Sequence, residues 1–412
     1  MHSWVAIHHG HDLFWICFHL EDVCKILAGE TDTDAVKRWT TPDPAAPEKH
    51  HFPTSLVHAV ALDRGLVVRV YVYHTLFDGH MRSHFIDCLA AATRGAKLHD
   101  SPSQTSIPFD YDSNPTFEER LAACPELFYL DPQYPAPTNP RQLNMFLGPR
   151  RPPPRRHQQD QQGLRLRPDE INEPQTRQRR LSSYSCIAAL TFAHVVKARL
   201  RSEGYKYFPK AAHASTAILR HQVDFRKRAF TEHMGDYFGN ATVSVSTRVD
   251  QQLVLGAAGA TGKDTGEGEA YVVEDFHDGK KEAEMLAELA EEVKRSIDEV
   301  NEEYVRARLA VGDSAPDPRR LGLDYDLRQP QVLGFNNWRH TGGKENWALP
   351  SGEQEMPEAF RLTRGYSMCN ALILLQRQDT DDQDVLVSLS EDAMKELLQD
   401  KGWMRWVSEI RD

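Results

Sequence analysis

One short segment, HTLFDG, contains the residues of this chain best suited to catalysis. They are His74, Asp78 and Gly79. A histidine that leaves a strand into a tight turn can point its imidazole into a cleft. There the neutral ring can take a proton from a hydroxyl or an amine near pH 7. Asp78 comes four residues later and cannot easily lie on the same face of the turn as His74. We therefore expect Asp78 to pair with an arginine and fix the loop. Gly79 permits the bend before a following helix.

Strands and a helix must hold this segment in place. Residues 56–73 contain two strand-like runs, and the second is dense in β-branched and aromatic residues. Residues 81–93 predict a helix that Gly95 stops. The histidine therefore lies in the loop of a strand–loop–helix unit. Taken alone, such a histidine is more often structural than catalytic.

Further along the chain, the periodicity of apolar residues predicts alternating helices and strands. Helices are expected from Ser182 or Ser183 to about Arg201, over 282–309, and after Ser390; strands are expected over 217–226 and 240–248, and a hairpin is expected from 364–376 with 384–389. Trp403 and Trp406 on the last helix are expected to be core residues.

Residues 148–180 differ from the rest in composition. They hold nine arginines against four acidic residues, with an RPPPRR run and a glutamine-rich run. This composition predicts a disordered basic linker, and a phosphate-binding role for its arginines is the alternative. We accordingly expect an N-terminal domain over 1–147 and a C-terminal domain over 181–412.

Composition narrows the class of protein. The chain has 412 residues, of which 40% are hydrophobic, so it has material for packed cores in two or three domains. Lys+Arg 49 minus Asp+Glu 60 gives a net charge of −11, which disfavours nucleic acid as a partner. The six cysteines include no CxxC pair, which is typical of reduced thiols rather than of disulfides or zinc. No metal is expected at His8, His9 and His11, and no signal peptide or membrane span is recognised, so we expect a cytoplasmic protein.

HxxxDG after an apolar strand resembles the signature of the CoA-dependent acyltransferase superfamily, which includes BAHD acyltransferases, chloramphenicol acetyltransferase and condensation domains. The resemblance extends from about residue 55 to the C-terminus, in the family's order, and is closest to the fungal, trichothecene acetyltransferase-like branch of the BAHD family. Segments 223–228 (VDFRKR) and 236–241 (DYFGNA) are similar to the family's "VDxRxR … YFGNA" region. Segment 181–190 is similar to the helix that opens the family's second domain, and 334–338 is similar to its "tSW" strand. Segments 365–375 and 385–398 are similar to its closing hairpin and helix.

This resemblance implies an α/β (α+β) fold of two chloramphenicol acetyltransferase-like domains, with mixed sheets flanked by helices, around a solvent channel. It implies His74 as general base, Asp78 and Gly79 as structural residues, and Arg226 as the salt-bridge partner of Asp78. Acyl-CoA would be a co-substrate and no cofactor would be bound permanently. The acceptor would be a hydroxyl or amine of a small secondary metabolite, and the protein would be a monomer with no nucleic-acid or membrane partner.

The chain departs from the family pattern at three places. The DFGWG motif is not legible in residues 350–361, and Asn336 and Asn337 stand before Trp338, where the family has a small hydroxyl residue. Asn337 and Trp338 are candidates for an oxyanion donor or a channel wall. His74 also lies closer to the start than in typical members, so we expect the first strand and helix of the N-terminal domain to be missing.

Alternative interpretations remain open at this stage. The missing motif and the short N-terminus favour a family member that acts as a non-enzymatic binding protein. A condensation domain is disfavoured by the YFGNA pattern and by Tyr73, because those enzymes usually have a second histidine at that position.

The sequence predicts the roles of the histidines and cationic residues around Arg226 less specifically. His221 and His233 could line the channel, but a polar surface role is the default. Lys227 and Arg228 could meet CoA phosphates, with solvated charge as the default. No residue is assigned to CoA from the sequence.

Overall fold

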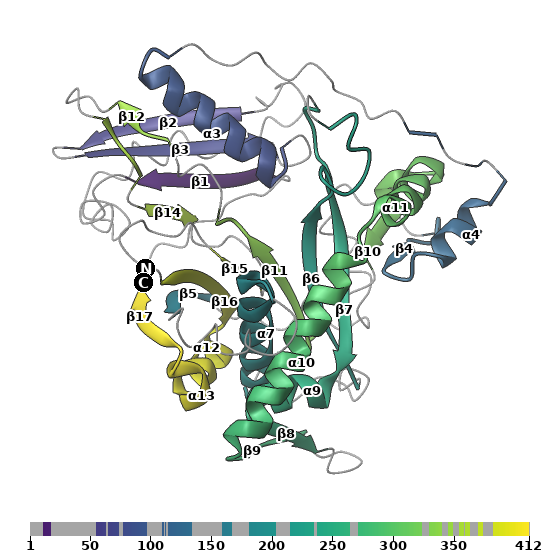
Figure 1. Cartoon of the computed structure of the whole chain (residues 1–412), viewed down its shortest axis with the longest axis vertical. Coiled ribbons are helices and arrows are strands. Elements are labelled where there is room, and N and C mark those ends of the chain that lie inside the picture. The colour runs from purple at the N-terminus through teal and green to yellow at the C-terminus, as the bar shows by residue number, and fades with distance from the viewer. Residues whose placement is uncertain are drawn as a thin grey trace.

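The computed structural model of the chain contains two main sheets with helices packed on them (Figure 1). It describes residues 11–17, 55–62, 65–73, 77–96, 109–110, 112, 114–133, 159–166, 181–202, 215–234, 237–263, 271–323, 329–339, 345–348, 354–357, 359–362, 370–373 and 382–411.

The first sheet has four strands in the order β14–β1–β3–β2, and every neighbouring pair is antiparallel. Its strands are β1 (His11–Cys17), β2 (Ser55–Leu62), β3 (Gly65–Tyr73) and β14 (Ala359–Leu362). Alternate valines of β3, Val68, Val70 and Val72, share a buried cluster with Ile86 and Ala90 of helix α3 (Gly79–Thr93). The predicted strand–loop–helix unit is thus confirmed, and a strand from residues 359–362 completes its sheet.

The second sheet has seven strands in the order β17–β5–β16–β15–β11–β6–β7. They are β5 (Gln159–Leu166), β6 (Thr216–Asp224), β7 (Thr242–Asp250), β11 (Val332–Asn337), β15 (Asn370–Ile373), β16 (Gln383–Ser390) and β17 (Val407–Arg411). Strand β11 runs parallel to both of its neighbours, whereas the other pairs are antiparallel. The predicted α/β class with mixed sheets flanked by helices is therefore confirmed.

Strand β5 corrects the prediction of a disordered linker over 148–180. Residues 159–166 of that range pair with all of β16 on one side and with β17 on the other. Composition misled here because a strand placed between two partners satisfies its backbone N–H and C=O groups whatever its side chains are. The other residues of 148–180 lie outside the described part of the chain.

Helix α7 (Ser183–Arg201) is the central helix of the second sheet's core (Figure 1). Ser182 caps it by accepting from the backbone N–H of Ser185 at 3.1 Å, as the sequence predicts. Every residue from 185 to 200 is buried, which is the behaviour of a helix covered on all sides. The same core includes Trp403 and Trp406, so their predicted role is confirmed.

The predicted helix over 282–309 is two helices, α10 (Gly279–Asp298) and α11 (Glu302–Ser314). Asn301 begins the second one, because its side-chain oxygen accepts from the backbone N–H of Tyr304 at 2.8 Å. The apolar spacing continues across this break, so periodicity alone could not locate it.

Several shorter elements complete the described structure. They are α4 (Phe117–Ala122), β4 (Leu127–Tyr129), α9 (Gln251–Ala257), β8 (Ala260–Lys263), β9 (Val272–Asp275), the 3-10 turn Pro318–Arg320, β10 (Leu321–Leu323), β12 (Trp347–Ala348), β13 (Gln354–Glu355), α12 (Glu391–Gln399) and α13 (Lys401–Met404). Ser390 precedes α12 as predicted, although its side chain makes no capping bond.

Three negative predictions concern metals, disulfides and membranes. Within the ranges given above, no group of three or more His, Cys, Asp or Glu side chains could hold a metal ion. Cys88, Cys124 and Cys186, the cysteines whose side chains are described, are free thiols. None of the described helices is both long enough and apolar enough to cross a membrane.

Candidate active site

The end of the loop between β3 and α3 links the two sheets through contacts of Phe77 and Asp78. His74 lies outside the described residues; it follows Tyr73, the last residue of β3. The described chain resumes at Phe77, which is buried and meets the rings of Phe85 and Phe238 edge to face, with centroids 5.7 and 5.6 Å away. Fixed structure therefore lies on both sides of the histidine in the sequence.

Asp78 is the best-anchored residue of the segment. It is 1% exposed and caps α3, with one oxygen accepting from the backbone N–H of Met81 at 2.9 Å. Its other oxygen accepts from Nη1 of Arg226 at 2.7 Å and from the backbone N–H of Ala241 at 2.8 Å. A carboxylate with both oxygens committed to donors, and a cation beside it, is an anchor and not a base.

The guanidinium of Arg226 connects the Asp78 loop to two further segments. Its Nη2 donates to the carbonyl of Gly239 at 2.7 Å, and its Nη1 lies 3.2 Å from Asp224 at the end of β6. Because Gly239 and Ala241 come just before β7, the loop before α3, the end of β6 and the start of β7 meet at one ion pair. The structure thus brings together Asp78 and Arg226, the pair expected from the sequence.

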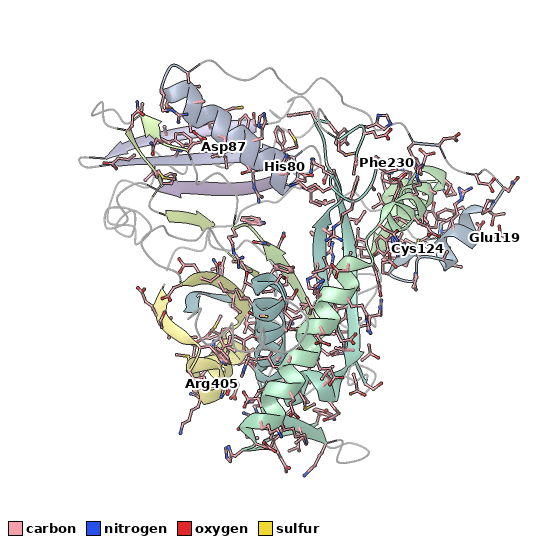
Figure 2. The ribbon with its side chains drawn as sticks, viewed as in Figure 1. His80, Asp87, Glu119, Cys124, Phe230 and Arg405 are labelled. Carbon is pink, nitrogen blue, oxygen red and sulfur yellow. The ribbon has the colours of Figure 1, made fainter. Side chains whose placement is uncertain are left out.

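Gly79 and His80 open helix α3 directly after the anchor. Gly79 is exposed and is the first helical residue. Figure 2 shows His80 at the end of α3 that faces the upper ends of β6 and β7. His80 is exposed at the surface, and desolvation of its ring together with the Arg226 guanidinium lowers the pKa of His80 from its ordinary value.

Asn337 and Trp338 lie at the end of β11. Asn337 is exposed, and its side-chain oxygen accepts from the backbone N–H of Arg339 at 3.0 Å. Trp338 is buried in the cluster that includes Val72 and Phe77, and the Arg82 guanidinium lies 4.0 Å from its ring centroid. Trp338 therefore packs the second sheet against the residues on either side of His74.

The histidine predicted as a polar surface residue in this region, His221, is fully buried. Its two ring nitrogens contact the hydroxyl of Tyr184 at 2.8 Å and that of Thr247 at 3.0 Å. Burial lowers the pKa of His221 to about 3, which keeps the ring neutral. The surface prediction was wrong because β6 turns this position toward α7. His233 is exposed.

Lys227 and Arg228 are the two cations that could meet CoA phosphates, and Arg228 is already bonded to the protein backbone. Nη1 of Arg228 donates to the carbonyls of Ile297 and Val300, at 2.8 and 3.3 Å, where α10 ends. It therefore satisfies backbone acceptors that the helix leaves open. Lys227 is exposed.

Sequence reasoning missed the backbone and cationic groups around the anchor. The N–H of Ala241 and the carbonyl of Gly239 carry no side-chain signal, although both lie inside the segment that resembles YFGNA. Arg82 was missed because a charged residue on a helix is normally assigned to solvent. It is in fact 1% exposed.

The sequence model of the Transferase family matches residues 18–257, which is 240 of the 412 residues and includes the Asp78–Arg226 pair. None of the curated protein sequences compared with the chain matches it.

Solved acyltransferase structures share the fold at low sequence identity. TRI101 of F. graminearum, complexed with coenzyme A and T-2 mycotoxin, has a TM-score of 0.60 at 15% identity, covering 89% of this chain and 72% of that one. Vinorine synthase has a TM-score of 0.52 at 13% identity, covering 95% and 89%. TRI3 trichothecene 15-O-acetyltransferase from Fusarium sporotrichioides has a TM-score of 0.50 at 12% identity, covering 96% and 91%. A family match over more than half of its length, together with this fold, shows that the chain belongs to the Transferase family, the BAHD acyl-CoA-dependent acyltransferases.

Proposed function

We propose that the chain transfers an acyl group from acyl-CoA to a hydroxyl or amine of a small secondary metabolite, with His74 as the general base. The observation that carries the proposal is the Asp78 anchor, which ties the residues just after His74 to Arg226 and Ala241. A base works only where it is held within reach of the proton it takes. Two charge-assisted bonds and an N-cap on one buried carboxylate supply such a rigid support.

The proposed reaction is direct. His74 takes the proton of the acceptor hydroxyl or amine as the acceptor oxygen or nitrogen attacks the thioester carbonyl. The tetrahedral intermediate then expels the CoA thiolate, and the protonated His74 returns the proton to that sulfur. Holding both substrates side by side contributes to the rate, and a donor to the developing oxyanion contributes further. We propose Asn337 and Trp338 as the residues that donate to the oxyanion or form the wall of the substrate channel beside it.

The solved relatives support the choice of substrates. One TRI101 structure holds coenzyme A with T-2 mycotoxin, and another holds coenzyme A with deoxynivalenol. Acetyl-CoA with these two alcohols is therefore the first substrate set to test. We further propose that CoA is a co-substrate rather than a permanent cofactor, and that the protein acts as a monomer in the cytoplasm.

Replacing His74 by alanine tests the proposed base. We expect kcat for acetyl transfer to fall by about 10²–10⁴-fold, the usual contribution of general acid–base catalysis, with little change in the Kd for CoA. His233→Ala, which removes an exposed histidine, is the matched control and should leave kcat unchanged. Unchanged transfer in His74→Ala, or a loss confined to His80→Ala, contradicts the assignment of the base.

Calorimetric titration of the wild-type chain with acetyl-CoA and with CoA separates the enzyme from a non-enzymatic binding protein. We expect saturable binding of both, and turnover with at least one acceptor. Saturable binding of an acceptor without any acetyl transfer would instead favour the binding protein.

A further inference from the structure

Arg82 is a buried cation that the proposed mechanism does not use. It lies on α3, one turn after Asp78, and is 1% exposed. Its guanidinium carbon lies 4.0 Å from the ring centroid of Trp338, the residue that follows β11. A cation over the face of an indole ring is attracted by the π electrons, and the attraction is stronger where water is excluded. Trp338 is 3% exposed, so this contact joins α3 to the second sheet away from solvent.

The Arg82 side chain points toward the start of the helix. A Cβ added at Gly79 would lie 3.8 Å from Nη2 of Arg82, so the guanidinium runs back along α3 to its first residue. The backbone N–H of Arg82 also donates to the carbonyl of Asp78 at 2.9 Å. The guanidinium therefore lies at the end of α3 that the Asp78 anchor fixes and that the loop with His74 enters.

Trp338 is held by the second sheet but packs in the core of the first. Its backbone N–H donates to the carbonyl of Ile373 in β15 at 2.8 Å, and it directly follows Asn337, the last residue of β11. Its ring belongs to the buried cluster formed by valines of β3 and apolar residues of α3. Arg82 and Trp338 therefore meet at the junction of the two sheets.

Two bridges from the start of α3 reach the same edge of the second sheet. Asp78 bonds to Arg226, two residues after β6, and Arg82 contacts Trp338, one residue after β11. Residues four apart lie on one face of a helix. Strands β6 and β11 are parallel neighbours, so their carboxyl ends lie at one edge of the sheet. A single bridge would let the helix pivot, whereas two bridges fix its direction.

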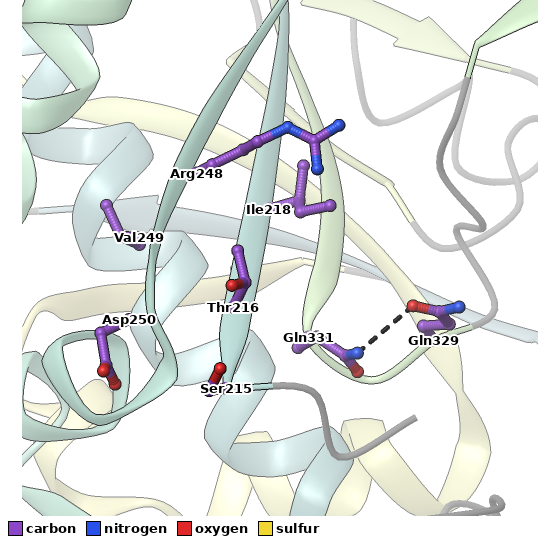
Figure 3. A pocket seen from close by; sticks show the side chains of 8 residues that line it. All are labelled: Ser215, Thr216, Ile218, Arg248, Val249, Asp250, Gln329 and Gln331. Carbon is purple, nitrogen blue, oxygen red and sulfur yellow. Dashed lines mark hydrogen bonds between the residues drawn. The ribbon is translucent and has the colours of Figure 1, made fainter. Parts of the chain in front are cut away.

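The opposite ends of these strands have no part in either bridge. There Thr216 and Ile218 of β6 and Gln331, just before β11, line a cavity of about 570 Å³ (Figure 3). Strand β6 has eight residue steps from Thr216 to Asp224, or roughly 27 Å at about 3.4 Å per residue. The two bridges are therefore separate from this cavity.

We propose that Arg82 is a positioning residue for acyl transfer. Its contact with Trp338 fixes the direction of α3, and with it the loop that carries His74, against the end of β11, where Asn337 and Trp338 are the proposed oxyanion donor or channel wall. A general base has to be held within reach of the proton it takes, so a change in this direction slows the chemical step. The proposal rests on the proposed function, because its readout is acetyl transfer.

Arg82→Met removes the cation and keeps an apolar side chain. We expect kcat for acetyl transfer to fall about tenfold or more, because small misplacements of reacting groups are costly. The rate is divided by the number of CoA-binding sites that titration calorimetry counts. A positioning role lowers kcat per CoA-binding site, whereas a merely structural role lowers the number of sites. An unchanged kcat per site overturns the proposal.

Arg82→Lys keeps a cation near the ring but loses the flat guanidinium. Its kcat per site should lie between the values for Arg82→Met and wild type, because the charge remains. Equal kcat per site in the two variants overturns the proposal, since the cation would then have no role. If Arg82→Met binds no CoA, Arg82→Lys carries the test alone, and a kcat per site equal to that of wild type overturns the proposal.

Arg94→Met is the matched control. Arg94 also joins α3 to the segment after β11, through Glu345 and the carbonyl of Asn346, but it lies 12 residues beyond Arg82, or roughly 18 Å at about 1.5 Å per residue. It should leave kcat per site unchanged. A fall as large as that in Arg82→Met overturns the proposal, because loosening α3 at any point would then have the same effect.

Combining Arg82→Met with Trp338→Leu tests the partner. If Arg82 acts through Trp338, Arg82→Met lowers kcat per site no further in a chain that already carries Trp338→Leu. Independent effects that multiply overturn the proposal. Wild type without any acetyl transfer overturns the proposed function and this proposal together, whereas transfer by wild type with an unchanged kcat per site in Arg82→Met overturns this proposal alone.

Discussion

At the scale of single residues, the anchor shows why two carboxylates beside the same arginine differ in importance. Asp78 is 1% exposed, whereas the Asp224 side chain is 42% exposed, yet both contact Arg226. Removing one partner of a buried ion pair leaves an uncompensated charge, while an exposed pair is largely replaced by water. The buried contact must therefore dominate both stability and loop position.

We expect Asp78→Asn to lower the free energy of unfolding by about 3 kcal/mol, because the buried Arg226 then keeps only the exposed Asp224 as counter-ion. Asp224→Asn, the matched exposed change, should cost less than about 1 kcal/mol. Urea denaturation of both variants checks this, together with kcat for acetyl transfer, which should fall only in Asp78→Asn. Equal costs for the two variants would mean that the buried pair does not stabilise the loop.

The pairing of Asp78 with Arg226 could be anticipated from sequence, because the family resemblance placed both in order and a buried carboxylate requires a cation. The backbone donor of Ala241 could not be anticipated. Backbone groups are the same in every residue, and only the folded positions of β6 and β7 reveal which one is near.

At the scale of elements, sequence patterns located the long helices and the strand pairs β2–β3, β6–β7 and β15–β16, but did not predict β1, β14 or β17, and were wrong at two places. Strand β5 was assigned to a linker because its glutamines and arginines lack alternation, and its partners β16 and β17 come more than 200 residues later. The break between α10 and α11 was missed because Leu289, Val293, Val300 and Tyr304 keep a helical spacing through it. Long-range pairing and side-chain capping override local pattern in these two cases.

The cap at Asn301 gives a prediction for that break. Asn301→Ala should destabilise the first turn of α11 by about 1 kcal/mol, because the N–H of Tyr304 loses its acceptor. Asn301→Ser keeps a capping oxygen, so its stability should differ from that of wild type by only about 0.3 kcal/mol. Hydrogen exchange at the Tyr304 amide measures the effect, and equal exchange rates in the alanine and serine variants would show that the side chain does not cap.

At the scale of the whole molecule, His221 couples folding to pH. Its pKa is about 3 in the folded chain against an ordinary value of 6.5. Between these values the unfolded chain binds a proton that the folded chain does not. Its contribution to stability is therefore complete above pH 6.5 and is lost progressively as the pH falls toward 3.

The His221→Gln variant isolates that contribution. Its free energy of unfolding should fall less steeply than that of wild type between pH 6 and 4, by about 1.4 kcal/mol per pH unit. Denaturation at pH 7.5, 6, 5 and 4 measures the two slopes, and a difference in slope is independent of any constant cost of the substitution. Parallel slopes would mean that His221 accepts a proton in the folded state.

The Asp78 anchor also sets an order of events during synthesis. Its partners Arg226 and Ala241 lie 148 and 163 residues downstream. At about 5–20 residues per second, the ribosome needs roughly 8–30 s to add that much chain. The loop after β3 therefore emerges long before Arg226 and Ala241 exist, and until then only the N–H of Met81 in the adjacent helix can bond to Asp78. The candidate site is therefore completed late, by residues at the end of β6 and the start of β7, and a chain released before they are made lacks the Asp78 anchor.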